Sequence, residues 1–249
     1  MIPKIIHYCW FGGKPKTEIA IECLKSWKTY APDFEIKEWN ETNTNQFQNK
    51  FYKDAYRKKQ FAFVADTIRV SVLKEYGGIY MDLDMLLLKP LNNFLSYDFF
   101  SGYEVEDRIA FGLFGGIKEH RFFQLMHHFY DITPFNQFSL PVITHTFSPI
   151  INEETLQENE IILDPDFFYA LTYQNRAQDF KKYLTINSIA VHLWDHSWKL
   201  KEEETLWVLI KKIKVVLVDY LFFNYPKAYF KRYFRAFSRK IAQKILLKS

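Results

Sequence analysis

The alternation of apolar and polar residues at the start of the chain predicts a strand, a helix and a second strand. Residues 4–11 are apolar and β-prone and stop at Gly12-Gly13, which indicates a buried strand followed by a tight turn. Residues 17–30 place apolar side chains at spacings of three and four, as an amphipathic helix does. Residues 34–39 alternate with period two, which is typical of a strand with one buried face. This order favours parallel strand pairing and an α/β fold.

A second helix and strand follow, and they carry the most informative residues of the chain. Residues 56–76 show helical periodicity and end at Gly77-Gly78. Glycine there supplies the left-handed conformation that stops a helix, and it lets the backbone approach a ligand closely. Residues 79–88 form an apolar run, predicted as one strand, that Asp82 and Asp84 interrupt. Farther along, the pattern weakens and favours short elements at residues 98–103, 109–114 and 122–130.

The two carboxylates are the first candidate for chemistry. Side chains at i and i+2 of an extended strand share a face, so Asp82 and Asp84 are expected about 7 Å apart along the chain. Burying two like charges is unfavourable unless a divalent cation such as Mg²⁺ or Mn²⁺ lies beside them. Such a cation can hold phosphate oxygens and stabilise a departing diphosphate. The pair alone is a weak signal, because two solvated acids at a strand end have the same spacing.

Length and composition predict one folded domain with an appendage. A chain of 249 residues that is 48% hydrophobic can bury a full core, and we expect an α/β domain over residues 1–205 followed by a helical segment over residues 206–249. The N-terminus has no signal-peptide pattern and the chain has only two cysteines, which favours the reducing cytoplasm.

The charge is divided unevenly between these two parts. From residue 211 to the end there are 11 Lys and Arg and one acid, whereas residues 1–210 hold 22 Lys and Arg against 28 Asp and Glu. This asymmetry indicates an attachment segment rather than a uniformly basic nucleic-acid binder, so we expect no nucleic-acid partner.

The basic segment itself predicts an amphipathic helix. From residue 229, apolar residues repeat at three and four with Lys and Arg on the other side, and no uncharged run approaches the roughly 20 residues needed to span a bilayer. The helix either lies on an anionic membrane surface or packs on the domain or on a second copy.

Three separated motifs give the aspartate pair a context. They are residues 2–12 (Ile-Pro-Lys-Ile-Ile-His-Tyr-Cys-Trp-Phe-Gly), residues 65–69 (Ala-Asp-Thr-Ile-Arg) and residues 76–85 (Tyr-Gly-Gly-Ile-Tyr-Met-Asp-Leu-Asp-Met). In these motifs the chain resembles glycosyltransferase family 32, the DXD sugar-binding proteins of the capsular polysaccharide synthesis type. It also resembles the related catalytic domain of the clostridial glucosylating toxins. The resemblance covers residues 1–92.

The resemblance implies a GT-A fold, a Rossmann-like α/β fold of nucleotide-diphospho-sugar transferases. It also implies Mn²⁺ or Mg²⁺, a nucleotide-sugar donor with UDP-hexose favoured over GDP-mannose, and retention of anomeric configuration. The acceptor is expected to be a glycan or a lipid-linked glycan, at the inner face of the cytoplasmic membrane. A retaining enzyme of this kind needs no separate catalytic base, because the departing phosphate takes the acceptor's proton.

The resemblance also assigns residues to the donor. It implies that Trp10 stacks on the base, with Ile6 and His7 nearby on the same strand, and that Tyr80 lies beside the sugar, next to Gly78. Trp10 is alternatively a core tryptophan, and Tyr80 a residue chosen for its β propensity.

Four charged residues receive the catalytic roles. The resemblance implies that Asp66 and Arg69 bind the donor's sugar hydroxyls and phosphate, that Asp82 contacts ribose, sugar or metal, and that Asp84 is the principal metal ligand. The spacing of Asp66 and Arg69 also fits a simple surface ion pair on a helix.

A cluster near the end of the predicted domain completes the candidate site. Ser197 and Trp198 resemble the loop that closes over the diphosphate, and His196 or His192 is a candidate metal ligand. A histidine between tryptophans is alternatively a packed core residue.

The residues alone are also compatible with two other classes of protein. A haloacid-dehalogenase-like phosphatase also has an Asp-x-Asp after an apolar strand, with the first aspartate as nucleophile. It predicts a Gly-Thr or similar after the second aspartate, where this chain has Met85-Leu86. A non-catalytic carbohydrate- or nucleic-acid-binding module accounts for the aromatic residues and the basic segment, but not for the aspartates.

Overall fold

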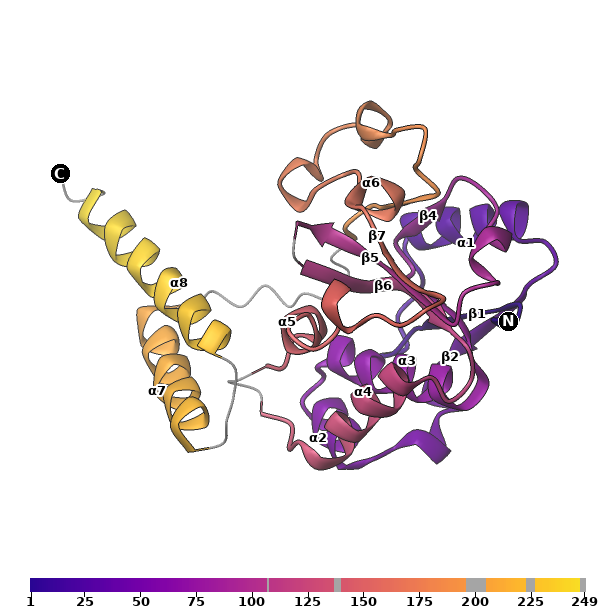
Figure 1. The fold of residues 1–249 in the computed structure, drawn as a ribbon. Helices are drawn as coiled ribbons and strands as arrows, with labels where there is room; N and C mark the ends of the chain where they lie inside the picture. Colours follow the sequence, from indigo (N-terminus) through magenta and orange to yellow (C-terminus); the bar gives the residue numbers. More distant parts are fainter. Residues whose placement is uncertain (107, 137–139, 196–204, 223–226, 247–249) are drawn as a thin grey trace.

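A six-stranded sheet forms the centre of the protein, and helices cover its faces (Figure 1). This computed structural model describes residues 1–106, 108–136, 140–195, 205–222 and 227–246. The sheet order is β2-β1-β3-β6-β5-β7, and β4 and β8 form a separate two-stranded sheet. The strands are β1 (Ile5–Cys9), β2 (Glu35–Trp39), β3 (Gly78–Met81), β4 (Met85–Leu87), β5 (Phe99–Val105), β6 (Arg108–Gly116), β7 (Glu160–Leu163) and β8 (Ala190–His192).

The helices fall into a set around the sheet and a pair at the end of the chain. The described helices are α1 (Glu18–Tyr30), α2 (Lys50–Arg57), α3 (Phe61–Tyr76), α4 (Arg121–Ile132), α5 (Ile143–Phe147), α6 (Pro165–Phe168), α7 (Leu206–Phe222) and α8 (Lys227–Leu246). Short 3₁₀ turns join several of them.

The N-terminal half confirms the predicted order of strand, helix and strand. β1 pairs in parallel with both β2 and β3, with Ile6 opposite Ile36 and Ile79. Thr17 caps α1 by accepting the Ala20 N–H at 3.1 Å, so this helix begins where the sequence predicts. β6 then runs antiparallel to β3 and makes the sheet mixed. The α/β fold expected from the sequence is therefore confirmed.

Two predicted elements are each divided in the structure. The helix predicted over residues 56–76 is two helices, separated at Lys59, whose φ is 55°. The strand predicted over residues 79–88 ends at Met81, where a turn begins and the Met85 N–H donates to the Asp82 carbonyl at 2.9 Å. Beyond the turn, β4 leaves the main sheet and pairs with β8. The prediction that both aspartates share one face of an extended strand is therefore wrong, since both lie in the turn.

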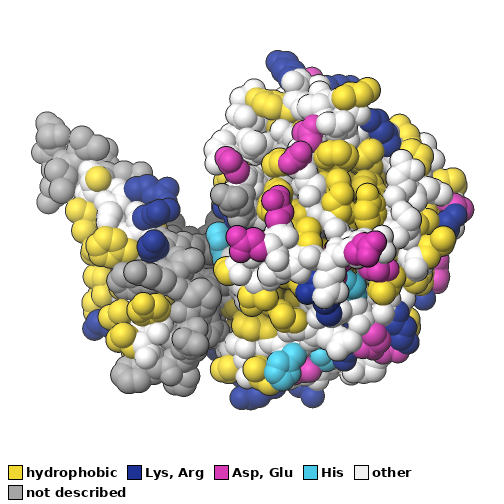
Figure 2. Space-filling view, viewed as in Figure 1, with side chains coloured by type: hydrophobic (Ala, Val, Ile, Leu, Met, Phe, Trp, Pro, Cys, Tyr) yellow, Lys and Arg dark blue, Asp and Glu magenta, His cyan; other side chains and the backbone are white. Residues whose placement is uncertain are grey.

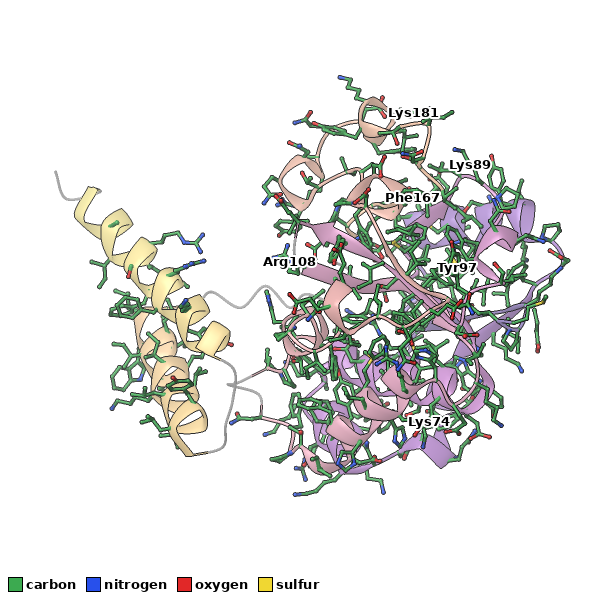
Figure 3. The ribbon with its side chains drawn as sticks, viewed as in Figure 1. Lys74, Lys89, Tyr97, Arg108, Phe167 and Lys181 are labelled. Carbon is green, nitrogen blue, oxygen red and sulfur yellow. The ribbon has the colours of Figure 1, made fainter. Side chains whose placement is uncertain are left out.

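Alternate side chains of the central strands enter two separate cores. Ile79 and Met81 face the core under α1, whereas Tyr80 faces the core under α3 and α4. The side chains fill the space between these layers (Figure 3). α3 is buried on nearly all sides because the sheet, α2 and α4 surround it, and this is why its polar residues are buried too.

The Gly77-Gly78 pair brings α3 and β3 close to β1. Both glycines have positive φ, at 65° and 102°. A Cβ on Gly78 would lie 2.8 Å from the Ile5 carbonyl and 3.0 Å from His7 Nε2. The close approach at Gly78 is therefore to β1, while a Cβ on Gly77 would lie 2.7 Å from the Lys118 N, so neither approach is to a ligand as the sequence suggested.

His7 is a neutral, hydrogen-bonded residue of the core. It is fully buried, its Nε2 lies 2.9 Å from the Gly77 carbonyl, and Trp39 Nε1 donates to its Nδ1 at 3.0 Å. Only the tautomer with a proton on Nε2 satisfies both contacts. Burial lowers the pKa of His7 from 6.5 to about 4.

We expect this histidine to destabilise the protein in acid. Because its pKa is lower in the folded chain than in the unfolded chain, the stability is present above pH 6.5 and is lost as pH falls towards 4. The wild type should lose about 3 kcal/mol more than His7→Gln between pH 7 and pH 4, as measured by urea unfolding. An equal loss in both proteins would contradict this prediction.

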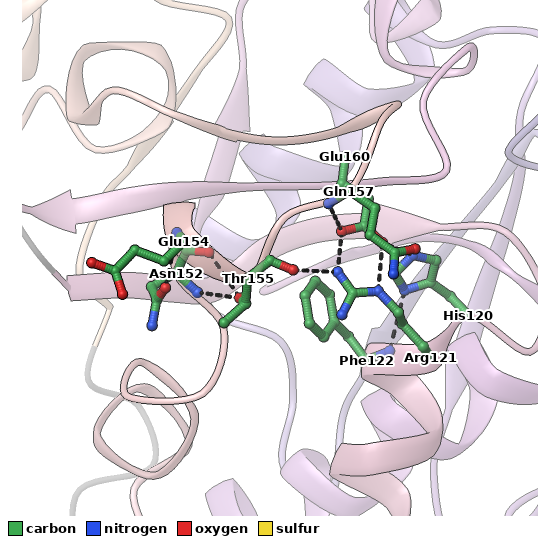
Figure 4. A network of polar contacts seen from close by, with 8 residues as sticks. All are labelled: His120, Arg121, Phe122, Asn152, Glu154, Thr155, Gln157 and Glu160. Atoms are coloured by element: carbon green, nitrogen blue, oxygen red, sulfur yellow. Dashed lines mark hydrogen bonds and ion pairs between the residues drawn. The ribbon is translucent and has the colours of Figure 1, made fainter.

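A buried ionic network anchors the far edge of the sheet. Glu160, at the start of β7, contacts His120 Nε2 at 2.9 Å and Arg121 Nε at 2.8 Å, and its side chain is 3% exposed (Figure 4). Arg121 also donates to the Thr155 carbonyl at 2.6 Å. These contacts fasten the N-terminus of α4 to β7, away from the aspartate turn.

The last two helices form a hairpin. Leu209 and Val216 of α7 are buried against Tyr233 of α8. Among the described residues, no helix is long and apolar enough to cross a membrane. α7 begins at Leu206, and the predicted division of the chain after residue 205 stays a prediction.

Candidate active site

Several predicted site residues meet at one edge of the sheet. β2, β1 and β3 are parallel, so their carboxyl ends, at Trp39, Cys9 and Met81, lie at the same edge. Asp82 follows the end of β3 directly, and Trp10 follows the end of β1. In open α/β sheets this edge is where ligands bind.

A buried arginine joins two of the predicted carboxylates there. Arg69 Nη2 lies 3.1 Å from Asp66 Oδ1 and 3.2 Å from Asp82 Oδ1, and Arg69 Nη1 donates to the Phe111 carbonyl at 2.7 Å. The side chains of Arg69 and Asp66 are each 8% exposed, whereas that of Asp82 is 30% exposed. The alternative of a simple surface ion pair is therefore wrong, because the pair is buried and includes a third charged group.

The cluster has an excess of negative charge, because the carboxylates of Asp66 and Asp82 share the single guanidinium of Arg69. Burial raises the pKa of Asp66 to about 7. The charge of Arg69 opposes this rise, and the charge of Asp82 adds to it. Burial also raises the pKa of Asp82, with Arg69 opposing and Asp84 adding to the rise. Such an excess of negative charge favours a cation or a hydrogen-bond donor at the exposed side of Asp82.

Tyr80 fixes one oxygen of Asp82. Its hydroxyl donates to Asp82 Oδ1 at 3.1 Å, and the Arg69 guanidinium lies 4.5 Å above its ring. The tyrosine is 1% exposed, so it holds the aspartate and the arginine from the core side. Its predicted contact with the donor sugar stays a prediction.

Asp84 is held from the C-terminal part of the chain. Its Oδ2 lies 3.0 Å from His192 Nε2 and accepts the Asp195 N–H at 2.9 Å, and its carbonyl accepts the Leu193 N–H at 2.8 Å. Asp195 in turn accepts the Thr17 hydroxyl at 2.6 Å. The turn is thus tied to the N-cap of α1 through a loop more than a hundred residues away in the sequence.

The loop after β8 is unusual in its backbone. Trp194 has a φ of 59°, a left-handed conformation that costs a bulky residue about 1 kcal/mol or more. Its indole donates to the Leu171 carbonyl at 2.8 Å, and its ring lies 4.0 Å from that of His192. Packing therefore maintains a strained backbone whose N–H groups face Asp84.

Three side chains suit a hard divalent cation. No hydrogen bond or ion pair within the described ranges reaches Asp82 Oδ2 or Asp84 Oδ1, and His192 Nδ1 is buried with no partner there. The described part of the chain shows no group of three or more His, Cys, Asp or Glu that could hold a metal ion, so the predicted metal site stays a prediction.

The contact with Asp84 favours the protonated form of His192. Burial disfavours its charged form, but the Asp84 carboxylate outweighs this and raises the pKa of His192. It forms an ion pair with Asp84, and binding a cation requires the loss of that proton. Its role as a metal ligand stays a prediction. His196, Ser197 and Trp198 lie outside the described residues.

The residues predicted to bind the base divide into two groups. Trp10 is partly exposed at the site edge, and its indole donates to the Lys14 carbonyl at 2.7 Å, so its position fits the prediction. Ile6 and His7 are 0% exposed and face the cores, and Gly78 is buried against β1. These three shape β1 and β3, and their burial does not support side-chain contact with a donor.

The structure adds four residues that the sequence pattern did not select. Thr17 and Asp195 connect α1 to Asp84, while Gly112 and Tyr169 lie behind Asp82. Gly112 accepts the Asp82 N–H at 2.7 Å, and the Tyr169 hydroxyl accepts the Leu113 N–H at 3.1 Å. The glycine at the centre of a strand was the one available signal, since glycine there often marks close approach.

We expect Gly112→Ala to impair the site more than the fold. A Cβ at Gly112 would lie 3.0 Å from Asp82 Oδ2 and 3.2 Å from the Tyr169 hydroxyl, so the carboxylate must shift. Activity should fall by about a hundredfold, as displacement of a positioned group by about 1 Å does. Gly102→Ala is the matched control, because a Cβ there would meet the Phe168 ring and not the site. It should lower the melting temperature and leave donor affinity unchanged. Equal donor affinities in both variants would refute the prediction.

Comparison with known proteins shows which family model the site region matches. Residues 17–100 match the model of the family described as glycosyltransferase sugar-binding region containing DXD motif. This range contains Asp66, Arg69 and both aspartates of the turn, so the resemblance seen in the sequence is confirmed.

The relatives are glycosyltransferases. An uncharacterized glycosyltransferase of Acanthamoeba polyphaga mimivirus is 36% identical over 110 residues, which is 40% of this chain and 42% of that protein. The human alpha-1,4-N-acetylglucosaminyltransferase is 28% identical over 53% of this chain and 42% of its own length. Inositol phosphoceramide mannosyltransferase 3 of Schizosaccharomyces pombe is 29% identical over 49% of this chain and 35% of its own length. The chain thus spans less than half the length of these relatives.

Solved glycosyltransferases also resemble the fold. The PaToxG glycosyltransferase has a TM-score of 0.47 and 19% identity, over 60% of this chain and 69% of its own. A glycosyltransferase involved in glycosylation of the PBCV-1 major capsid has a TM-score of 0.46 and 13% identity, over 79% of this chain and 95% of its own.

Proposed function

We propose that the protein is a retaining glycosyltransferase that moves a hexose from a nucleotide-diphosphate sugar to a glycan or a lipid-linked acceptor. UDP-hexose is the favoured donor, over GDP-mannose. The observation that carries this proposal is the buried Asp66–Arg69–Asp82 cluster beside Asp84, at the carboxyl edge of the parallel strands. The match of residues 17–100 to the family model supports it.

The cluster suits the recognition of a sugar attached to a diphosphate. Asp66 is fixed by Arg69, and Asp82 by Arg69 and Tyr80, so neither carboxylate needs to reorganise when a hydroxyl group donates to it. Preorganised acceptors of this kind orient a sugar at little entropic cost. Trp10, at the end of the neighbouring strand, offers a ring for the base.

A divalent cation would be held by Asp84 and Asp82, with His192 as a further ligand after loss of its proton. Bound there, Mn²⁺ or Mg²⁺ neutralises charge that develops on the departing diphosphate. Asp195 and Thr17 orient Asp84 through the Asp195 N–H, and Tyr80 orients Asp82. These residues therefore act by positioning carboxylates rather than by transferring protons.

Calorimetric titration with UDP-hexoses and GDP-mannose, with and without Mn²⁺, tests the proposal. We expect one donor class to bind with Mn²⁺ and to lose affinity when a chelator is added. Slow release of free sugar from the same donor should follow, with the anomeric configuration retained. Release of phosphate from a generic phosphate ester, without donor binding, would instead establish the phosphatase.

A further inference from the structure

The α7–α8 hairpin exposes apolar and basic side chains together. Figure 2 shows Lys and Arg side chains next to apolar ones on its surface. The most exposed apolar residues are Trp207 at 64%, Leu221 at 61% and Phe234 at 53%. The two helices already bury Leu209 and Val216 between them. Large apolar side chains that stay exposed on the outside therefore indicate a surface that binds another molecule or a membrane.

Helical geometry places Leu221 and Phe234 on one broad side of the hairpin, with Trp207 about 160 to 180° from the residues that α7 buries. At roughly 100° per residue, Leu217 and Leu221 lie about 80 to 140° round α7 from the buried Leu209 and Val216. By the same rule Phe234 and Ile241 lie about 80 to 100° round α8 from the buried Tyr233. Leu209, Val216 and Tyr233 mark the contact line between the two helices. Because the helices run antiparallel, side chains at the same helical angle from this line, one on each helix, point to the same side of the hairpin. The four exposed residues on this side are Leu217, Leu221, Phe234 and Ile241.

Basic residues flank that apolar side. Lys214 and Lys231 are exposed and lie at the margins of the apolar sectors, about 140 to 160° from the contact line of the helices. The partly buried Lys212 stacks over the Tyr233 ring at 5.6 Å, and Lys211 over the Trp207 ring at 5.5 Å. An apolar strip with cations at its margins is the pattern of a helix that lies in the boundary between lipid headgroups and acyl chains.

We propose that this side of the hairpin docks the protein on an anionic lipid bilayer. Charge selects this occupant: residues from 211 onward carry 11 Lys and Arg and one acid, so a second copy of the hairpin would be repelled. The exposed side chains are mainly aliphatic, which suits acyl chains and not the stacking of nucleic-acid bases.

The charge of the rest of the chain orients the protein on the surface. Residues 1–210 hold 28 acids against 22 Lys and Arg, so an anionic surface repels this part while it attracts the hairpin. The inference does not rest on the transferase reaction, and vesicle binding tests it without a donor.

Co-sedimentation of the full chain with vesicles is the first experiment. The wild type should pellet with vesicles of phosphatidylcholine and phosphatidylserine, and less with phosphatidylcholine alone or at high salt. Lys214→Glu with Lys231→Glu should lower the partition coefficient by about tenfold or more. Leu221→Ser with Phe234→Ser should lower it by a similar factor while the salt dependence persists.

Matched controls on the α/β body separate docking from general effects. Lys181→Glu with Lys182→Glu changes the charge equally on exposed body residues, Lys181 being labelled in Figure 3. Ile186→Ser with Ile132→Ser removes two apolar residues that are 87% and 66% exposed. Both controls should bind vesicles like the wild type, and circular dichroism should show the wild-type helix content in every variant.

Fluorescence gives an independent measure of contact. Brominated lipid should quench part of the tryptophan emission of the wild type, and Trp207→Phe should lose that part. Recovery of the wild type in the supernatant with anionic vesicles at low salt would overturn the proposal. So would equal losses in hairpin and body variants, or a hairpin variant that changes only the oligomeric mass by light scattering, which would assign this side to a second copy.

Discussion

Replacement of Asp84 by asparagine should lower sugar transfer and donor hydrolysis by about a hundredfold to a thousandfold. The amide oxygen can still accept the Asp195 N–H, so the turn keeps its shape, but the negative charge beside His192 and the proposed cation is lost. Initial rates with the best donor, together with a Mn²⁺ titration, measure the effect. Manganese affinity should fall by about tenfold or more.

Asp131→Asn is the control for this substitution. Asp131 lies on α4, its side chain is 41% exposed, and its partners are His127 and Asn49. Its variant should match the wild type in rate and in manganese affinity. If Asp84→Asn keeps rates and manganese affinity within about threefold of the wild type, Asp84 has no part in the chemistry.

Replacement of Arg69 by methionine should give the largest loss of stability. The substitution leaves Asp66 and Asp82 in the cluster without their shared cation and leaves the Phe111 carbonyl without its donor. Removal of one partner from a buried ionic group costs about 3–5 kcal/mol, which corresponds to a melting temperature lower by roughly 10 °C. Donor binding should be lost even at temperatures where the variant is folded.

Arg57→Met supplies a control of the same geometry. Arg57 and Asp54 also form an i, i+3 pair on a helix, but the arginine is 73% exposed. Its loss should cost about 0–1 kcal/mol. Arg69→Lys should be intermediate, since one ammonium cannot reach three acceptors in the geometry of the guanidinium fork. A methionine variant within about 1 kcal/mol of the wild type would show that the cluster does not contribute to stability as argued.

The elements with clear periodicity were predictable from the sequence alone. β1, α1 and β2 lie where residues 4–39 predict them, because alternation and helical spacing coincide there with turn residues at each boundary. The break at Lys59 was not predictable, since a left-handed lysine leaves the helical spacing of apolar residues unchanged. The end of β3 at Met81 was missed for a related reason: the run of apolar residues continues into β4, which pairs with another strand.

The site was predictable where one local motif carries it. Asp66, Arg69, Asp82 and Asp84 lie close in the sequence and meet in the structure. Thr17 and Asp195 were not found because their hydrogen bond joins residues 178 positions apart, and a single sequence contains no signal for that contact. The burial of His7 was not predictable, because a buried histidine and a ligand-binding histidine look alike until Trp39 and Gly77 are seen to satisfy it.

The two aspartates of the turn are mounted on different supports. Asp82 follows β3 of the six-stranded sheet, whereas Asp84 precedes β4 of the two-stranded sheet. Trp27 and Ser26 of α1 hydrogen-bond to the backbone of β4. The distance between the two carboxylates therefore depends on how these two sheets pack against each other. Substitutions in the core between α1 and β4 should change the relative affinity for large and small cations without replacing any of the proposed ligands.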